Sequence, residues 1–136
     1  MNIEEFLTQT DLVLGNEGVH SDYGCSEQSV PAMIEYVNNH FPDYPCCVVA
    51  DWKWVDMKAP PEVQEMFGEH GLKPSAVLAH RVVSDDSMRG FKSVRTTLLK
   101  ELHKNCIFLT RNTAYILIEP GKRVSVDAPV FTSIFG

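Results

Sequence analysis

The side chains best suited to covalent chemistry in this chain are the thiol of Cys25 and the imidazole of His80. Cys25 follows Gly24 and stands a few residues before a predicted helix, whose positive end would lower the pKa of a thiol and stabilise the thiolate. His80 lies within a predicted strand, from which it could act as a general base. No third residue is assigned to orient this histidine, and the fuller motifs of thiol hydrolases are missing. A small thiol hydrolase that uses Cys25 and His80 is therefore the alternative prediction, and a non-catalytic protein is the main one.

The cysteines and glycines form no recognisable metal or cofactor motif. Four cysteines are present, but they include no CxxC pair, and no histidine has a zinc-ligand spacing from a cysteine pair. In a chain without an export signal, such cysteines are predicted to be reduced. The phosphate-loop patterns GxGxxG and GxxxxGK are also missing. We therefore predict no metal, no cofactor and no disulfide.

Charge is distributed unevenly along the chain. Residues 1–70 carry thirteen acidic residues against two lysines, a net charge of −11, whereas residues 71–136 carry five acidic residues against ten basic ones, a net charge of +5. Charge asymmetry on this scale concerns association with partners more than it concerns the fold. It predicts a protein partner for the acidic part, provided that the acidic helices pack side by side. The candidate binding residues are Glu35, Asp43, Glu62, Glu65 and Glu69.

The basic half supports a further alternative, nucleic-acid binding through Lys92, Arg95 and Arg111. The overall net charge of −6 opposes this interpretation, and no known nucleic-acid motif is present. A solvated sheet surface, or an intramolecular match to the acidic helices, explains these basic residues better.

The elements that must position these residues fall into two groups. Apolar residues at helical spacing predict helices over residues 2–14, 30–41 and 60–70, the first capped by Asn2 and the last closed by Gly71. From residue 48 onward the pattern favours β structure. Strands are predicted over residues 48–55, 76–83, 94–99, 106–110, 114–118, 124–126 and 130–135. The fold class is therefore α+β, an antiparallel sheet of about five to six strands with about three helices packed on one face.

Several local features sharpen this prediction. Trp52 and Trp54 share one strand face and are predicted to lie in the core, with Asp51 and Lys53 alternating against them. Residues 111–113 predict a hairpin turn that joins Phe108 to Tyr115. Residues 119–122 supply the next turn. The apolar segment 130–135 completes the sheet, or alternatively pairs across a two-fold homodimer.

Length and composition favour a single domain over residues 1–136, with an acidic helical part at 1–44 and a mainly sheet part at 45–136. The first residues lack the positive start of a secretory signal, and no segment approaches the roughly 20 apolar residues of a membrane span. We therefore expect a cytoplasmic protein that does not enter a membrane.

Four segments resemble a family of small uncharacterised proteins of Pseudomonas and its phages, which carry a domain of unknown function. The segments are PCCVVADWKWVDM (45–57), LAHRVVSDDSMRGF (78–91), VRTTLL (94–99) and CIFLTRNTAYILIEPGKR (106–123). The resemblance covers about two thirds of the chain and leaves out residues 1–44. The resemblance implies only a bacterial or phage origin, because the family supplies no activity, cofactor or partner that could be carried over. Together with the charge, it predicts an accessory protein that binds another macromolecule, with inhibition of a host defence complex as the concrete form.

Overall fold

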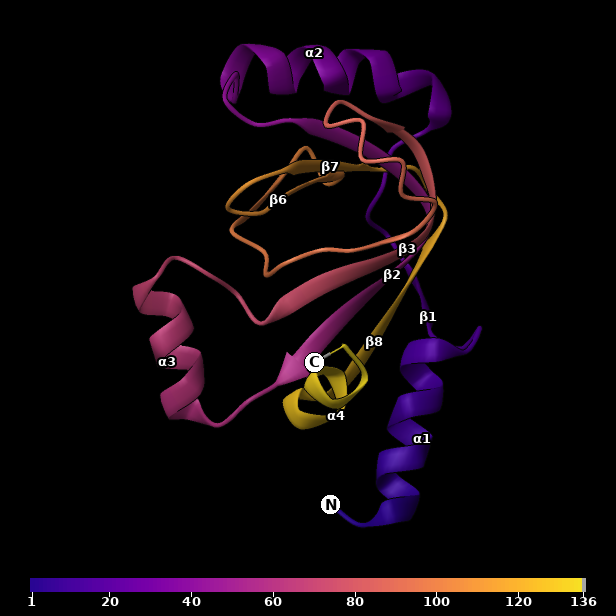
Figure 1. Cartoon of the computed structure of the whole chain (residues 1–136), viewed down its shortest axis with the longest axis vertical. Helices are drawn as coiled ribbons and strands as arrows, with labels where there is room; N and C mark the ends of the chain where they lie inside the picture. The colour runs from indigo at the N-terminus through magenta and orange to yellow at the C-terminus, as the bar shows by residue number, and fades with distance from the viewer. Residues whose placement is uncertain (136) are drawn as a thin grey trace.

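The computed structural model describes residues 1–135, which form a mixed α+β structure with four α-helices and an eight-stranded curled sheet (Figure 1). The helices are α1 (Ile3–Leu14), α2 (Val30–His40), α3 (Pro61–Glu69) and α4 (Ala128–Phe135), and a short 3-10 turn covers Glu27–Ser29. The strands are β1 (Val19–Ser21), β2 (Cys46–Lys58), β3 (Ser75–Asp85), β4 (Val94–Arg95), β5 (Glu101–His103), β6 (Ile107–Leu109), β7 (Ala114–Leu117) and β8 (Gly121–Asp127). The predicted α+β class is confirmed.

The 13-residue strand β2 organises the sheet. On one side it pairs antiparallel with β3, which in turn pairs with β4. On the other side it pairs in parallel with β7 along its first part and with β8 along its second part. β7 continues the sheet through β6 to β5, and β8 continues it to β1. The sheet is therefore mixed rather than purely antiparallel. Because β7 and β8 run in the same direction along β2, residues 119–122 do not form the predicted turn but carry the chain onward beside β2.

Side-chain alternation along β2 changes phase at Asp51, whose φ is +52°. Before it, Cys47 and Val49 point into the core inside the curl of the sheet; after it, Trp52 and Trp54 point into the same core. A regular strand would send odd and even positions to opposite faces throughout. The predicted burial of both tryptophans is confirmed, and Lys53, which alternates with them, is also buried, at only 4% exposed.

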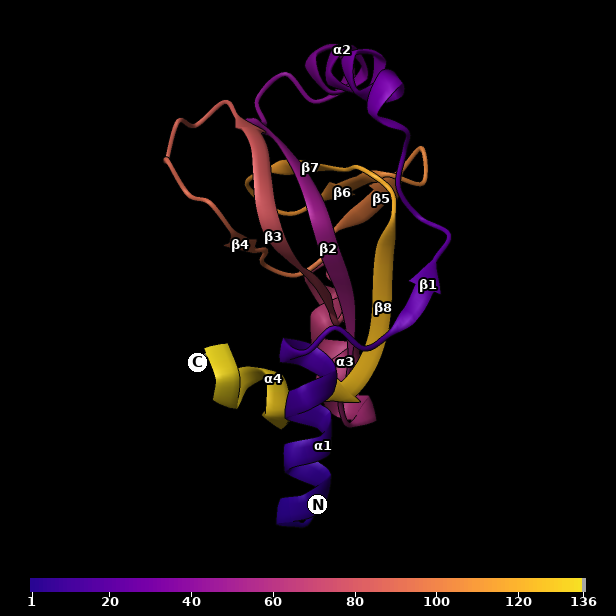
Figure 2. The same cartoon turned by 90° about the vertical axis from the view of Figure 1, so that its right-hand side faces the viewer.

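Three helices cover the outer face of the sheet, opposite the tryptophan core. α2 packs over the Cys46, Val48 and Ala50 side of β2, at one end of the molecule. At the other end, α1 and α4 pack together over the outer side chains of β2 and β8 (Figure 2). The fourth helix, α3, covers neither face. The predicted placement of helices on one face is thus correct for α1 and α2 and wrong for α3.

The prediction of a strand over residues 130–135 is wrong, because these residues belong to α4. Their β-branched and aromatic composition favours a strand. However, Val130, Phe131, Ile134 and Phe135 also recur at helical spacing, and Pro129 suits a first helical turn. Val130 and Phe131 are buried against the sheet, so tertiary packing selects the helix.

Other local predictions are confirmed. The Asn2 side chain accepts a hydrogen bond from the backbone N–H of Glu5 and caps α1. Beyond α3, Gly71 has a φ of +69°, and the Leu72 amide donates to the Phe67 carbonyl, which completes a glycine-dependent helix end. In the β6–β7 hairpin, Phe108 lies directly opposite Tyr115.

Candidate functional site

The most exposed regular element is α3, which lies in the long connection between β2 and β3. We call residues 59–74 the α3 excursion. Pro61 occupies the first turn, where its missing N–H costs no hydrogen bond, and all nine helical residues remain at least partly exposed. Figure 1 shows the helix standing away from the sheet, and its contacts with other elements are isolated ones. The excursion therefore holds a helix that contributes little to the core.

The surface of α3 is acidic with an apolar component. Glu62, Glu65 and Glu69 are exposed, and within residues 1–135 none of them takes part in an ion pair. Met66 lies between them in the sequence and is 50% exposed. Glu69 stands in the last helical turn, where a negative charge opposes the helix dipole and no basic residue offsets it. Glu62, in the first turn, has the favourable position for an acidic residue, whereas Glu69 has the unfavourable one.

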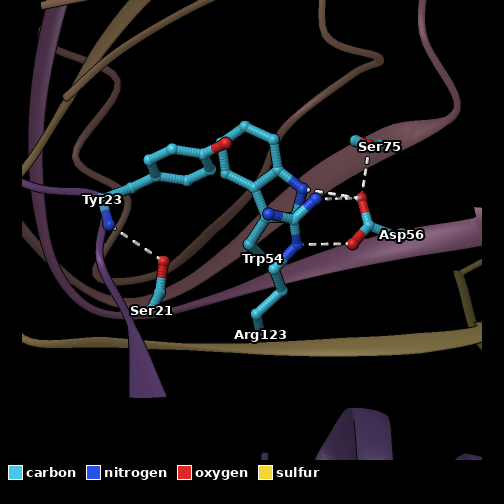
Figure 3. A network of polar contacts seen from close by, with 6 residues as sticks. All are labelled: Ser21, Tyr23, Trp54, Asp56, Ser75 and Arg123. Atoms are coloured by element: carbon cyan, nitrogen blue, oxygen red, sulfur yellow. Dashed lines mark hydrogen bonds and ion pairs between the residues drawn. The ribbon is translucent and has the colours of Figure 1, made fainter. Parts of the chain in front are cut away.

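A polar network fixes the base of the α3 excursion to the sheet (Figure 3). The Asp56 carboxylate, near the end of β2, accepts hydrogen bonds from Ser75 Oγ at 2.8 Å and from Trp54 Nε1 at 2.9 Å. Arg123 of β8 donates to both carboxylate oxygens, at 2.6 and 3.2 Å. Because Asp56 lies before the excursion and Ser75 directly after it, the network holds its two ends together.

The electrostatics of this network favour the ionised carboxylate. Burial alone would raise the pKa of Asp56, but hydrogen bonds from Arg123, Ser75 and Trp54 outweigh it and lower the pKa below the ordinary 3.8. Hydrogen bonding to Asp56 raises the pKa of the Arg123 guanidinium. The pair is therefore fully charged at neutral pH.

Two aromatic rings complete the surroundings of Arg123. Its guanidinium carbon lies 5.5 Å from the centre of the Tyr23 ring and 5.3 Å from the centre of the Trp54 ring. The two rings themselves are 4.9 Å apart, centre to centre. Figure 3 shows the guanidinium beside the Trp54 indole, with Tyr23 next to it. Cation–π attraction therefore adds to the ion pair in ordering this part of the sheet.

The other acidic candidates lie far from α3. Glu35 is exposed on α2 and Asp43 is exposed just after it, at the opposite end of the molecule from α3 (Figure 1). Because α2 and α3 do not pack side by side, they do not meet the condition for one continuous acidic face. Glu62, Glu65 and Glu69 do share a single short helix.

The basic candidates are also separated in the sheet. Arg95 lies in β4 and Lys92 shortly before it, whereas Arg111 lies in the turn between β6 and β7. β3, β2 and β7 intervene between β4 and β6 in the strand order. The Arg95 guanidinium stands over the Phe135 ring at 5.5 Å, which gives it a contact within the chain.

Cys25 and His80 have separate surroundings. Cys25 is 9% exposed, and its thiol contacts Cys106 in the core beneath α2. Burial raises the pKa of this thiol, the opposite of the shift expected from a nearby helix start. His80 is exposed and lines a cleft with Asp51 and Lys122. These positions and pKa shifts therefore do not support a reactive Cys25 thiolate paired with His80 as its base.

Burial shifts the pKa of the remaining thiols in the same direction. Burial raises the pKa of Cys46 to about 12, of Cys47 to about 11 and of Cys106 to about 12. All four cysteines are free thiols. In the part of the chain that the structure describes, no group of three or more His, Cys, Asp or Glu side chains is arranged to hold a metal ion.

Sequence reasoning missed Asp56 and Arg123 as a structural pair. One signal was available: Trp54 and Asp56 are two residues apart in a strand, so their side chains lie on one face and can hydrogen-bond. The partner of Asp56 was not predictable, because Arg123 is 67 residues away and meets it only through the parallel pairing of β2 with β8.

Comparison with known proteins shows that most of the chain matches one family model. Residues 22–133 match the model described as "Domain of unknown function (DUF6957)". The match begins before the segments that carried the resemblance and includes α2. No curated protein and no solved structure matches the chain. None of the helices within residues 1–135 is long and apolar enough to cross a membrane.

Proposed function

This chain belongs to the DUF6957 family, and we propose that it is a non-catalytic binding protein that presents the acidic face of α3 to a basic surface on a protein partner. The observation that carries the proposal is the exposure of α3, a helix with three free glutamates and a half-exposed methionine on an excursion whose base is fixed. An acidic residue in the last turn of a helix, such as Glu69, disfavours folding, and unfavourable local features of this kind are typical of functional sites.

The physical basis of recognition is electrostatic steering followed by apolar contact. The three glutamates would attract a cluster of Lys or Arg, and complementary charge raises the rate of encounter. Met66 would then contact an apolar side chain of the partner, since its flexible thioether adapts to irregular surfaces. The resemblance to proteins of Pseudomonas and its phages directs the search for this partner to bacterial proteins, host defence complexes among them.

The test is affinity capture from a Pseudomonas lysate with the intact protein and two charge variants. The first variant changes Glu62, Glu65 and Glu69 to Lys. The matched control changes Glu4, Asp11 and Glu27 to Lys, which alters the net charge equally at other exposed positions. We expect a partner retained by the intact protein and the control, lost by the α3 variant, and released as salt rises from about 50 to 300 mM, because surface charge is screened.

Two results would contradict the proposal. Equal retention of the same partner by both variants would move the interface away from α3. If the intact protein captures nothing above background, the binding role itself fails. Circular dichroism of each variant checks that the fold is retained.

A further inference from the structure

A second feature of the molecule is a cleft of about 530 Å³. It opens where the kink of β2 at Asp51 faces the start of β8 and the connection from α1 to β1. Its volume falls within the range of small-molecule sites. Its wall carries four basic side chains, namely His20, Lys53, His80 and Lys122.

Lys53 is the unusual member of this wall. It is 4% exposed, and its ammonium donates hydrogen bonds to the carbonyls of Leu12 at 2.6 Å and Gly15 at 2.7 Å, at the end of α1. An ammonium group has three donors, so one remains for another acceptor. Buried charges are normally paired with an opposite charge, yet among residues 1–135 Lys53 forms no ion pair.

The charged neighbours of Lys53 do not fully compensate its positive charge. Burial and the charge of Lys122 lower the pKa of the Lys53 ammonium, and the charge of Glu17 offsets this only in part. Lys122 donates to the carbonyl of Asn16, and His20 lies opposite Lys122 in the β1–β8 pairing. The one acid on the wall, Asp51, is 3.3 Å from the Arg81 guanidinium, so its charge is already matched.

We propose that this cleft binds the phosphate group of a small molecule, with Lys53 and Lys122 as the cationic contacts and His20 and His80 as additional donors. A phosphate carries up to two negative charges and several acceptor oxygens, which matches two ammonium groups and two imidazoles. It would supply the counter-charge that Lys53 lacks. This site is independent of the acidic face of α3.

The test is a titration followed by ¹⁵N–¹H NMR of the full-length protein at constant ionic strength. The probes are inorganic phosphate, adenosine monophosphate and adenosine. We expect saturable shifts for both phosphate-bearing probes at Gly15, Asn16, Gly121 and Lys122, and none for adenosine. Tighter binding of the nucleotide than of phosphate would show that the cleft also contacts the organic part, and equal binding would show that it recognises the anion alone; both outcomes support a phosphate site.

Three variants assign the contacts. Lys122→Gln and His80→Gln change exposed side chains, and each should weaken phosphate binding. For Lys122→Gln we expect the affinity to fall about tenfold, because one charge-assisted hydrogen bond is lost. Lys92→Gln removes the same charge outside the cleft and should leave the affinity unchanged. Shifts spread over all basic residues without saturation, or equal losses in Lys92→Gln and Lys122→Gln, would overturn the proposal and leave the two lysines as a clamp on the end of α1.

Discussion

Replacing Arg123 by Met tests whether the polar network around Asp56 stabilises the fold. The change removes two hydrogen bonds to the carboxylate and two cation–π contacts while keeping an apolar stem of similar length. Hydrogen bonds to charged groups contribute about 1.5–3 kcal/mol when well buried. The Arg123 and Asp56 side chains are 43% and 30% exposed, so solvent screening reduces the contribution of the ion pair to about 1–2 kcal/mol.

The aromatic contacts add about 0.5–1 kcal/mol each at such partly exposed sites. Because Met retains part of the packing against Tyr23 and Trp54, the expected total loss is about 2–3 kcal/mol. Urea unfolding followed by tryptophan fluorescence measures it. For a chain of this size we expect the midpoint to fall by roughly 1 M or more.

The dependence on pH provides an independent check. The pKa of Asp56 is lowered in the folded state, so its ionisation stabilises the protein fully above the ordinary value of 3.8. This contribution is lost as pH falls through the folded-state pKa. The difference between the intact protein and Arg123→Met should therefore shrink between pH 7 and about pH 2.5.

The control is Arg81→Met. Arg81 pairs with Asp51 at 3.3 Å, but both side chains are about two-thirds exposed, so its loss should cost less than about 0.5 kcal/mol. The reasoning is refuted if the two variants lose equal stability at pH 7. It is also refuted if the cost of Arg123→Met is the same at both pH values.

Three further predictions concern two glycines, the packing of α4 and the burial of the thiols. Gly121→Ala should destabilise the protein by about 3 kcal/mol, because a Cβ there would overlap the Trp52 indole. Gly68→Ala on α3 meets open space and should stabilise the protein by about 0.5–1 kcal/mol. Denaturant midpoints of the two variants that fail to move in opposite directions would contradict this reasoning. Phe131→Ala should cost about 3–5 kcal/mol by urea unfolding, since this residue of α4 is only 6% exposed and packs against the sheet, and a cost below about 1 kcal/mol would show that α4 is not packed as described. The four thiols should react with Ellman's reagent at pH 8 only after denaturant is added, and a single thiol that reacts within seconds in the native protein would restore a case for a reactive cysteine.

Local sequence patterns predicted those elements whose signals lie within a few residues. Asn2 and Gly71 mark helix ends through their own backbone hydrogen bonds, and the hairpin that pairs Phe108 with Tyr115 depends on one short turn. The binding candidates on α3 were also visible in this way, because Glu62, Glu65 and Glu69 share a helix. What the sequence could not predict was whether the acidic helices meet.

Features that depend on distant pairing were decided only by the tertiary structure. Residues 119–122 resemble a turn, yet the chain continues there along β2, because β8 finds its hydrogen-bonding partner in a strand some 70 residues earlier. Residues 130–135 have strand composition, yet burial of Val130 and Phe131 against β2 and β8 makes them a helix.

The same reason explains the contrast between Asp51 and Lys53, two of the charged residues of β2. Alternation grouped Asp51 with Lys53 opposite the tryptophans, but Asp51 lies at the kink of β2 and stays exposed, whereas the end of α1 covers Lys53. The sequence by itself determined the helix ends, the hairpin, the buried tryptophans and the charge of each segment, since these depend on local spacing and residue type. The tertiary structure decided which charges are buried, paired or free, because burial depends on elements that meet only in the folded chain.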